Sequence, residues 1–285
     1  MRGEYFIRDR EGGKSTLGEL VVRALRVSPA AAAALIAQGG VWDWARRQRQ
    51  RDGSRPAGET LFKVFVPPFP VRPCRISPAS IRYQDDLLLA VIKEAGVPVQ
   101  PTPYSDLDCL AAGVNVYLRD TDQGGPAHLI NRLDRPAMGL VLFARDRAGA
   151  RSLSSLFHGR QMEKTYLVLT APFPGVQGEY SLDAEIEWRG QSRGARTRVR
   201  FLGERRGRFA FLAWPETGRT HQIREHFRQF LTPIDGDIGP ASTRIMLACV
   251  AYRFDHPRGH QPVVISYLPD CFLPHLPSGF DPERG

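Results

Sequence analysis

The chain has 285 residues, of which 42% are hydrophobic and 24% charged, ordinary values for a soluble globular protein that argue against global disorder. No apolar run approaches the roughly 20 residues that cross a membrane, and residues 1–16 lack the apolar core of a secretory signal, so we expect a cytoplasmic protein with no membrane partner. The formal net charge of +9 favours a polyanionic partner, above all a nucleic acid.

The first part of the chain predicts a small α+β module. Residues 1–10 read as a polar tail. Helical spacing of apolar residues, Ser or Thr at the helix starts and a final apolar run predict two helices and a strand, at residues 15–27, 28–40 and 59–69. We therefore expect a module over residues 1–68 and a proline-rich linker over residues 69–80.

The remainder, residues 81–285, predicts an α+β domain with a mixed or antiparallel sheet. Apolar or alternating runs predict strands at residues 85–101, 139–146, 163–171, 196–204, 208–216 and 244–254. Helices are predicted at residues 147–161 and 219–231, the second with Ile223, Phe227 and Phe230 facing inward. Many strands, few helices and no β–α repetition argue against a regular parallel α/β fold.

Nothing in the sequence indicates a metal ion or a cofactor. The four cysteines are far apart and form no C-x-x-C pair, so we expect buried, reduced thiols. Residues 12–16 end like a phosphate-binding loop, but Arg8 stands where that loop needs a glycine. His221 and His226 are five residues apart, a spacing at which one helix would not present both to a single metal ion.

Positive charge is concentrated between Arg189 and Arg228. This segment has eleven arginines and only three acidic residues. Such a stripe attracts polyanions because their bound counterions are released. We expect it to contact RNA rather than to form a solvated face.

Three blocks of sequence stand in a specific order and at specific spacings. They are NRLDRPAMGLVLF at residues 131–143, EKTYLVLT at residues 163–170 and ETGRTHQIREHF at residues 216–227, the last followed by TPIDGD at residues 232–237. Together they resemble the RluA-type pseudouridine synthase family, whose motifs run H-R-L-D-x-x-T-S-G, K-x-Y, G-R-T-H-Q-[IL]-R and P-I-x-G-D. The resemblance covers about residues 81–275.

The resemblance implies an isomerase that converts a uridine of structured rRNA or tRNA to pseudouridine, without metal or cofactor, and we expect a monomer. Asp134 matches the family's catalytic aspartate, Tyr166 its active-site tyrosine and Arg219 the conserved arginine of its third motif. Arg132 matches the arginine that occupies the gap left by the flipped nucleotide. Ile223, one helical turn after Arg219, is a candidate for the uridine pocket and equally for the core.

The chemistry of these residue types fits the implied reaction. Isomerisation breaks the bond between uracil and the sugar, turns the base over and rejoins it through carbon 5; an ionised carboxylate can attack the sugar or remove its 2′ proton. Burial raises the pKa of an aspartate from about 3.9 and a facing guanidinium lowers it, so we expect Arg219 to keep Asp134 ionised. Tyr166 offers a ring for uracil and a hydroxyl near carbon 5. The planar guanidinium of Arg132 can stack where the flipped base has left.

The sequence departs from the family pattern around Asp134. Asn131 stands where the family has His, and Ala137 with Met138 replaces Thr-Ser. Ala248 falls where His is common in the closing strand. Because the aspartate, tyrosine and arginine are retained, we expect activity, with a loop that has lost hydroxyl hydrogen bonds and suits a divergent substrate.

Two further readings remain open from the sequence. Residues 1–68 loosely resemble the alpha-L RNA-binding module, but the predicted second helix lacks basic residues; RRQRQR at residues 46–51 either supplies that charge or is a solvated loop. The alternative function is a non-catalytic RNA-binding or ribosome-assembly factor on a synthase fold. A DNA-binding protein fits the charge but not the motifs.

Overall fold

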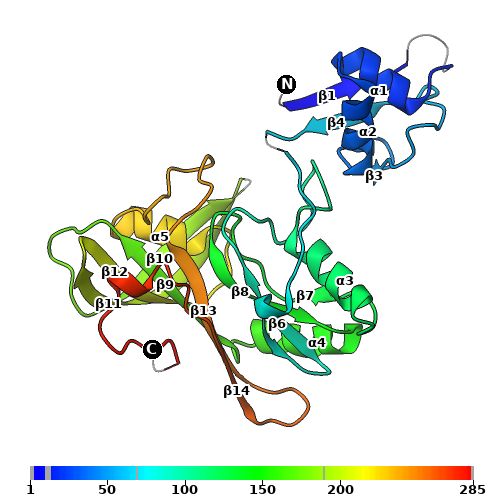
Figure 1. Cartoon of the computed structure of the whole chain (residues 1–285). Coiled ribbons are helices and arrows are strands. Elements are labelled where there is room, and N and C mark those ends of the chain that lie inside the picture. Colours follow the sequence, from blue (N-terminus) through cyan, green and yellow to red (C-terminus); the bar gives the residue numbers. More distant parts are fainter. Residues whose placement is uncertain (1–2, 10–13, 69, 189, 284–285) are drawn as a thin grey trace. The chain divides into compact units, whose positions relative to one another are not determined.

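The computed structural model describes residues 3–9, 14–68, 70–188 and 190–283. The chain forms two compact units (Figure 1). The first contains residues 1–75 and 100–116, and the second contains residues 76–99 and 117–285. No single helix among the described residues is long and apolar enough to cross a membrane; the first two helices together meet the length and composition required, with a bend of 117° between them.

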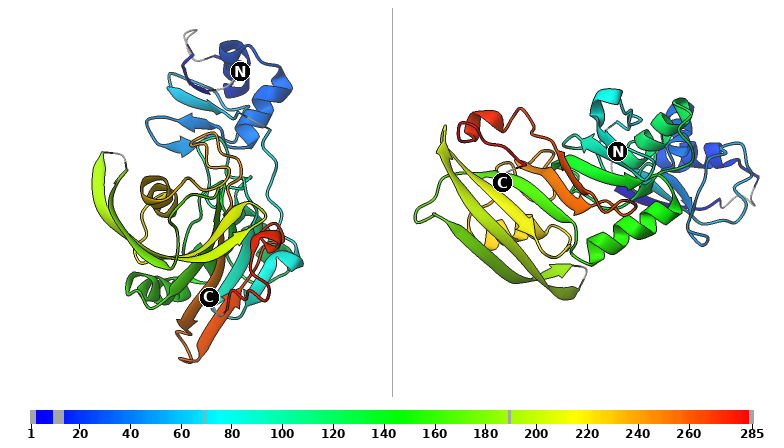
Figure 2. Two further views of the ribbon diagram at one scale, coloured as in Figure 1. Left: turned by 90° about the vertical axis from the view of Figure 1, so that its left-hand side faces the viewer. Right: turned by 90° about the horizontal axis from the view of Figure 1, so that it is seen from below.

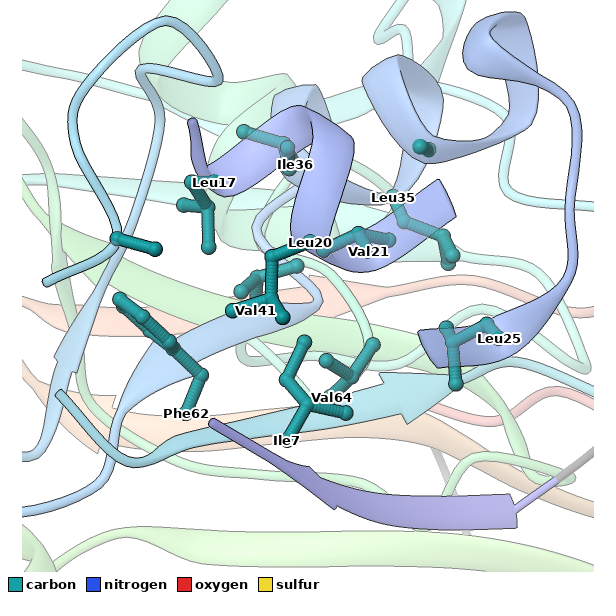
Figure 3. Close-up of a cluster of buried hydrophobic side chains, with 12 residues drawn as sticks. Ile7, Leu17, Leu20, Val21, Leu25, Leu35, Ile36, Val41, Phe62 and Val64 are labelled. Atoms are coloured by element: carbon teal, nitrogen blue, oxygen red, sulfur yellow. The ribbon is translucent and has the colours of Figure 1, made fainter. Parts of the chain in front are cut away.

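The first unit pairs two helices with a four-stranded antiparallel sheet in the order β1-β4-β2-β3. Its elements are β1 (Gly3–Ile7), α1 (Leu17–Leu25), α2 (Pro29–Ala37), β2 (Val41–Asp43), β3 (Gln48–Arg49) and β4 (Phe62–Val66). Thr16 caps α1 in a reciprocal capping box with Glu19, and Ser28 caps α2. Ile7, Phe62 and their neighbours on the sheet point toward the helices and close the core (Figure 3).

The expected polar tail at residues 1–10 is wrong, because residues 3–7 form strand β1. This strand pairs antiparallel with β4 along its whole length, and Ile7 is buried in the core. Five residues with one buried side chain carry little periodicity. Only the partner strand, about 60 positions later in the chain, decides that they are extended.

Residues 100–116 pack with the first unit, although the sequence analysis assigned them to the second domain. The indole of Trp42 donates a hydrogen bond to the carbonyl of Pro103 (3.0 Å), and Arg49 donates to the carbonyl of Thr102 (2.5 Å). Both bonds join segments more than 50 residues apart in sequence. Hydrophobic periodicity carries no signal for such contacts, so a boundary drawn from the linker alone does not find them.

The second unit is built on a large mixed sheet in the order β10-β11-β12-β9-β13-β8-β6-β5, with β7 on β8 and β14 on β13. Its strands are β5 (Ile81–Gln84), β6 (Leu88–Lys93), β7 (His128–Leu129), β8 (Met138–Ala144), β9 (Glu163–Thr170), β10 (Glu179–Trp188), β11 (Gln191–Arg205), β12 (Arg208–Pro215), β13 (Leu247–Asp255) and β14 (Pro262–Ser266). Helices are α4 (Arg147–His158), α5 (Gln222–Phe230) and α3 (Leu110–Asp120), which spans the division between the units. Short 3₁₀ turns are η1 (Pro78–Ser80) and η2 (Leu273–His275).

Opposite faces of β10–β12 are covered by different segments. Phe211 meets Phe227 of α5 edge-on, with ring centroids 5.4 Å apart. The neighbouring Leu212 faces the other way and packs in one cluster with Phe272 of the C-terminal segment. Figure 2 shows α5 (yellow) and this C-terminal segment (red) on the two sides of the curved strands. The sheet is therefore buried on both faces here.

One predicted inward residue of α5 is wrong. Ile223 and Phe227 are buried as expected, but Phe230 at the last position is 45% exposed. Instead, the inward face of α5 includes polar side chains: Gln222, Arg224 and His226 are all buried. Three of the five buried residues of α5 are polar, so it is not an ordinary core helix. Two of them, Gln222 and Arg224, belong to the candidate site described below.

Gly139 lets strands β8 and β13 approach closely. The two strands run parallel, with Gly139 opposite Cys249. The glycine has a φ of +107°, and a Cβ there would lie 2.6 Å from the Cys249 nitrogen and overlap its carbonyl oxygen. Only glycine meets both demands. This contact joins the half of the sheet that follows Asp134 to the half that carries β9.

Candidate active site

Asp134 lies in the loop between β7 and β8, where its carboxylate faces the start of α5. The side chain is 22% exposed. One carboxylate oxygen lies 3.4 Å from Nη1 of Arg224, and the other lies 3.8 Å from Nε2 of His221. His221 caps α5 in the left-handed conformation, with a φ of 58°. The partly exposed acid is thus approached by two nitrogen-bearing side chains from a single turn.

Arg224 is held by a second carboxylate, from the loop after α5. Its Nε and Nη2 donate to the two oxygens of Asp237, at 2.9 and 2.8 Å. The Arg224 side chain is 8% exposed and that of Asp237 only 1%. The hydrogen bonds to Asp237 raise the pKa of Arg224 above its usual value, so this guanidinium is permanently charged. A fork fixed on one side presents its remaining nitrogen to Asp134 in a single direction.

Asp237 is ionised despite its burial. Burial by itself would raise the pKa of its carboxyl. The hydrogen bonds from Arg224 and from the amide of Gly239 outweigh burial and hold this pKa below its usual value. Arg228 adds a further contact at 3.3 Å. The clamp on Arg224 is therefore a charged, hydrogen-bonded pair.

The expectation that Arg219 pairs with Asp134 is wrong. Among the described residues, the guanidinium that reaches Asp134 belongs to Arg224. Arg219 precedes α5, its side chain is exposed, and its Nε donates to the carbonyl of Gly194 on β11 (3.1 Å). The two arginines are five positions apart in one motif block. Sequence order alone did not distinguish the residue inside the helix from the residue before it.

Gln222 is a motif residue that the sequence analysis did not single out. It is buried, and its amide oxygen accepts from the backbone nitrogen of Arg219 (3.0 Å) and the hydroxyl of Thr217 (2.6 Å). Its amide nitrogen donates to the carbonyl of Arg196 (2.8 Å) and the hydroxyl of Thr197 (2.9 Å). The contacts to Arg196 and Thr197 tie the first turn of α5 to strand β11, and those to Thr217 and Arg219 fix the loop that leads into the helix. Gln222 thereby fixes the position of the helix turn from which the Arg224 side chain extends.

Tyr166 lies on β9, opposite Ala213 on one side and Cys249 on the other. Its side chain is buried. Burial, and then the neighbouring Cys249 and Asp134, raise the pKa of its hydroxyl well above the usual value. The phenol is therefore neutral at physiological pH. It can donate a hydrogen bond or relay a proton, but it does not serve as a phenolate base.

Lys93 is hydrogen-bonded to the loop that carries Asp134. It ends strand β6 and is fully buried, and its ammonium donates to the carbonyls of Glu94 (2.9 Å), Val97 (2.8 Å) and Arg135 (3.0 Å). Arg135 directly follows Asp134. The only signal in the sequence for this role was a lysine at the end of an apolar strand, and the role of Lys93 was not predicted.

Substituting Lys93 by methionine should loosen this loop. We expect Lys93→Met to lower the free energy of unfolding by about 2–4 kcal/mol, because three carbonyls in part-buried bonds lose a charged donor. Turnover should fall with it, since the residue next to Asp134 is one of the three. Urea unfolding and steady-state rates check both effects. An unchanged unfolding midpoint would show that the carbonyls find other donors.

The departures from the family pattern are accommodated in the interior. Asn131 is buried and uses both ends of its amide: Nδ2 donates to the hydroxyl of Tyr252 (2.5 Å), and Oδ1 accepts from the amide of Leu142 (2.9 Å). Met138 lies opposite Ala248 in the β8–β13 pairing, and both are buried. A large and a small side chain therefore share this position of the sheet.

The other two predicted site residues differ in exposure. Arg132 is exposed, two positions before Asp134. Ile223 is buried and directly precedes Arg224 in α5. Its position next to the clamp is compatible with a place in the pocket and with a place in the core. Both roles stay predictions.

The arginine-rich segment from Arg189 to Arg228 is not one free basic surface. Half of its described arginines pair with acids, most of them from other parts of the chain; these pairs are Arg196–Asp183, Arg198–Glu163, Arg208–Asp235, Arg224–Asp237 and Arg228–Glu225. A count of charges within one segment of sequence does not include acidic residues from other segments that the fold places beside its arginines. The remaining positive charge is smaller than the sequence suggested.

No cluster of three or more His, Cys, Asp or Glu side chains that could hold a metal ion occurs among the described residues. The four cysteines are free thiols. Cys109 and Cys249 are buried as expected, whereas Cys74 and Cys271 are half-buried. The polar side chains that gather around Asp134 form an ion-pair network of aspartates, arginines and one histidine.

Comparison with known proteins identifies this arrangement. The family described as RNA pseudouridylate synthase matches residues 87–229, which contain the three motif blocks. The chain is 29% identical over 223 residues to tRNA pseudouridine synthase C of Haemophilus ducreyi, covering 67% of this chain and 90% of that protein. It is 26% identical over 226 residues to the dual-specificity RNA pseudouridine synthase RluA of Vibrio cholerae, covering 71% and 89%.

A solved structure gives the same result. Human RNA pseudouridylate synthase domain containing 1 matches with a TM-score of 0.54 at 25% identity, over 68% of this chain and 84% of that chain. The chain belongs to the RNA pseudouridylate synthase family, in its RluA-type branch. The predicted enzyme class, an isomerase acting on RNA, and the predicted mixed-sheet fold are confirmed. The RNA-binding role of residues 1–68 stays a prediction.

Proposed function

We propose that this protein converts one uridine of a tRNA or a ribosomal RNA to pseudouridine, with Asp134 as the reacting carboxylate. The observation that carries the proposal is the position of Asp134: a partly exposed carboxylate at the end of a clamped guanidinium, in the first motif block. The relatives' names support the substrate class, since one acts on tRNA and another has dual specificity.

The geometry supports a division of labour in the reaction. The bond from the sugar C1′ to N1 of uracil breaks, the base turns, C1′ bonds to carbon 5, and carbon 5 loses a proton while N1 gains one. Asp134 supplies the negative charge at the sugar, and Arg224 keeps that charge oriented. Tyr166, neutral and next to Asp134, packs against the base and relays the proton from carbon 5.

Tritium release tests the proposal directly. RNA labelled at carbon 5 of uridine, prepared from a strain that lacks this protein, is incubated with the wild-type protein. Release of label is expected, because carbon 5 exchanges its proton during isomerisation. Tight RNA binding without release would favour the alternative, a non-catalytic RNA-binding or ribosome-assembly factor.

Arg132 is proposed to stack in the space that the flipped uridine leaves. It is exposed beside Asp134, where a planar guanidinium can replace a base. We expect Arg132→Lys to lower kcat/KM by about tenfold or more, because an ammonium keeps the charge but cannot stack. The substitution should have its full effect on structured RNA and little effect where the target is already unstacked. Equal losses on both substrates would contradict the proposal.

We further propose that the protein acts in the cytoplasm as a monomer and without a metal ion. The residues around Asp134 provide the charge and proton transfer that the reaction needs. EDTA is therefore expected to leave the initial rate unchanged. Inhibition that added metal ions reverse would contradict this expectation.

A further inference from the structure

The sheet of the first unit has one face turned away from the helices. Side chains alternate along its strands, so Ile7 and Val64 face the core, whereas Phe6 and Phe65 face outward. We call this surface the outer face. Its exposed members are Phe6 and Arg47, and Trp42, Trp44, Arg49 and Lys63 are partly exposed. Phe65 is buried at one end of this face, edge-on to Tyr104, and Glu4 pairs with Lys63.

Aromatic rings and cations are interleaved on the outer face. The guanidinium of Arg47 lies 3.7 Å above the ring of Trp44, and that of Arg49 lies 4.3 Å above Trp42. Phe6 meets Trp44 edge-on at 5.4 Å. Phe6 is 56% exposed, although a core of ample size lies on the other side of the same sheet. Interleaved rings and guanidinium groups are the surface that unpaired bases use for stacking.

Two arginines of the loop between β2 and β3 are exposed. Arg47 is exposed, and Arg46 has a side chain that is 72% exposed, 3.6 Å from Asp43. Arg49 and Arg51 belong to the same basic run but are engaged with Asp106, so they serve the fold. The run therefore divides into two arginines that build the unit and two that are available for a ligand.

Among the residues of this unit that the structure describes, the two helices carry no comparable cluster of rings and cations. Helix α2 is composed of alanine, leucine, isoleucine and one proline and has no charged side chain. On α1, Arg23 is paired with the buried Asp9 (2.8 Å). Charge and stacking groups thus gather on the sheet.

We propose that the outer face binds an unpaired segment of the RNA substrate, with bases stacked on Phe6 and on the Arg47–Trp44 pair and phosphates held by Arg46 and Arg47. The partner is RNA because exposed guanidinium groups lie directly beside the rings, so that phosphates and stacked bases of one strand can be bound together. The proposal rests on the proposed function for the identity of the partner. It assigns to the first unit the binding of an unpaired segment of the same RNA.

The test compares the full-length chain with a double variant, Phe6→Ala/Arg47→Ala. A short fluorescent single-stranded RNA and the same length of abasic strand are titrated by anisotropy. We expect the wild type to prefer the strand that has bases and the double variant to lose about tenfold or more in affinity for it. Arg26→Asn is the matched control: it also removes one positive charge from an exposed position, at the end of α1 where asparagine tolerates the left-handed φ of 54°.

Each outcome decides the proposal. Equal binding of abasic and normal strands, an equal loss in Arg26→Asn, or wild-type affinity in the double variant would overturn it. A lower thermal midpoint in the double variant would overturn it as well, because both residues are exposed and should not carry stability. Tritium release separates this proposal from the proposed function. If the wild type releases tritium but the double variant binds RNA as tightly as the wild type, only the RNA-binding role of the outer face is contradicted. If binding depends on the bases but no tritium is released, only the isomerase function is contradicted.

Discussion

Asp134→Ala is expected to reduce the rate of uridine isomerisation by about a hundredfold to ten-thousandfold. The affinity for RNA should stay nearly unchanged. The carboxylate contributes charge at the reacting sugar, whereas binding comes from many contacts elsewhere on the RNA. Folding should survive the change, because Arg224 keeps both of its bonds to Asp237. Tritium release from labelled RNA measures the rate, and anisotropy measures the affinity.

Two companion variants make this result specific. Asp134→Asn keeps the shape and removes only the charge, so it should be as inactive as the alanine variant. Glu225→Gln removes an acid from the third motif block that pairs only with the half-exposed Arg228 among the described residues. It should retain its rate. Turnover near the wild-type level in either Asp134 variant would sink the assignment of the reacting group.

Arg224→Ala is expected to damage both the fold and the reaction. It leaves the carboxylate of Asp237 buried and largely unpaired, which costs about 3–5 kcal/mol of the free energy of unfolding. It also frees Asp134 from its guanidinium, and misplacement of a reacting group by about 1 Å costs on the order of a hundredfold in rate. Urea unfolding and single-turnover rates measure the two losses separately.

Three control variants separate Arg224 from its neighbours. Arg228→Ala removes a more exposed contact to the same Asp237 and should cost less than about 1 kcal/mol. Arg219→Ala removes an exposed side chain bonded to the carbonyl of Gly194, so the unfolding midpoint should hardly change. Arg224→Lys keeps the charge but not the fork, and should remain impaired. A midpoint in Arg219→Ala as low as in Arg224→Ala would contradict the clamp described above.

The sequence by itself determined the class of protein and led to the prediction that Asp134 is the reacting residue. Three motif blocks in order predicted the family, and Asp134 and Tyr166 were named from them. Local rules placed the elements that depend on neighbouring residues: Thr16 and Ser28 do cap α1 and α2, the apolar runs do form β9 and β12, and the alternating run does form β11. Caps and alternation are properties of a few consecutive residues, so they can be read without the fold.

Only the tertiary structure decided which arginine serves Asp134. Arg219 and Arg224 stand in the same motif, and the choice depends on the angle at which α5 leaves Gln222 and on Asp237, 13 positions beyond Arg224. The role of Lys93 was hidden for the same reason, since its target carbonyl on Arg135 is 42 positions away. Strand β1 and the placement of residues 100–116 likewise depend on distant partners. The physical reason is common to all of them: composition and periodicity report on a residue's burial, whereas the direction of a guanidinium or ammonium is set by groups that only the folded chain brings together.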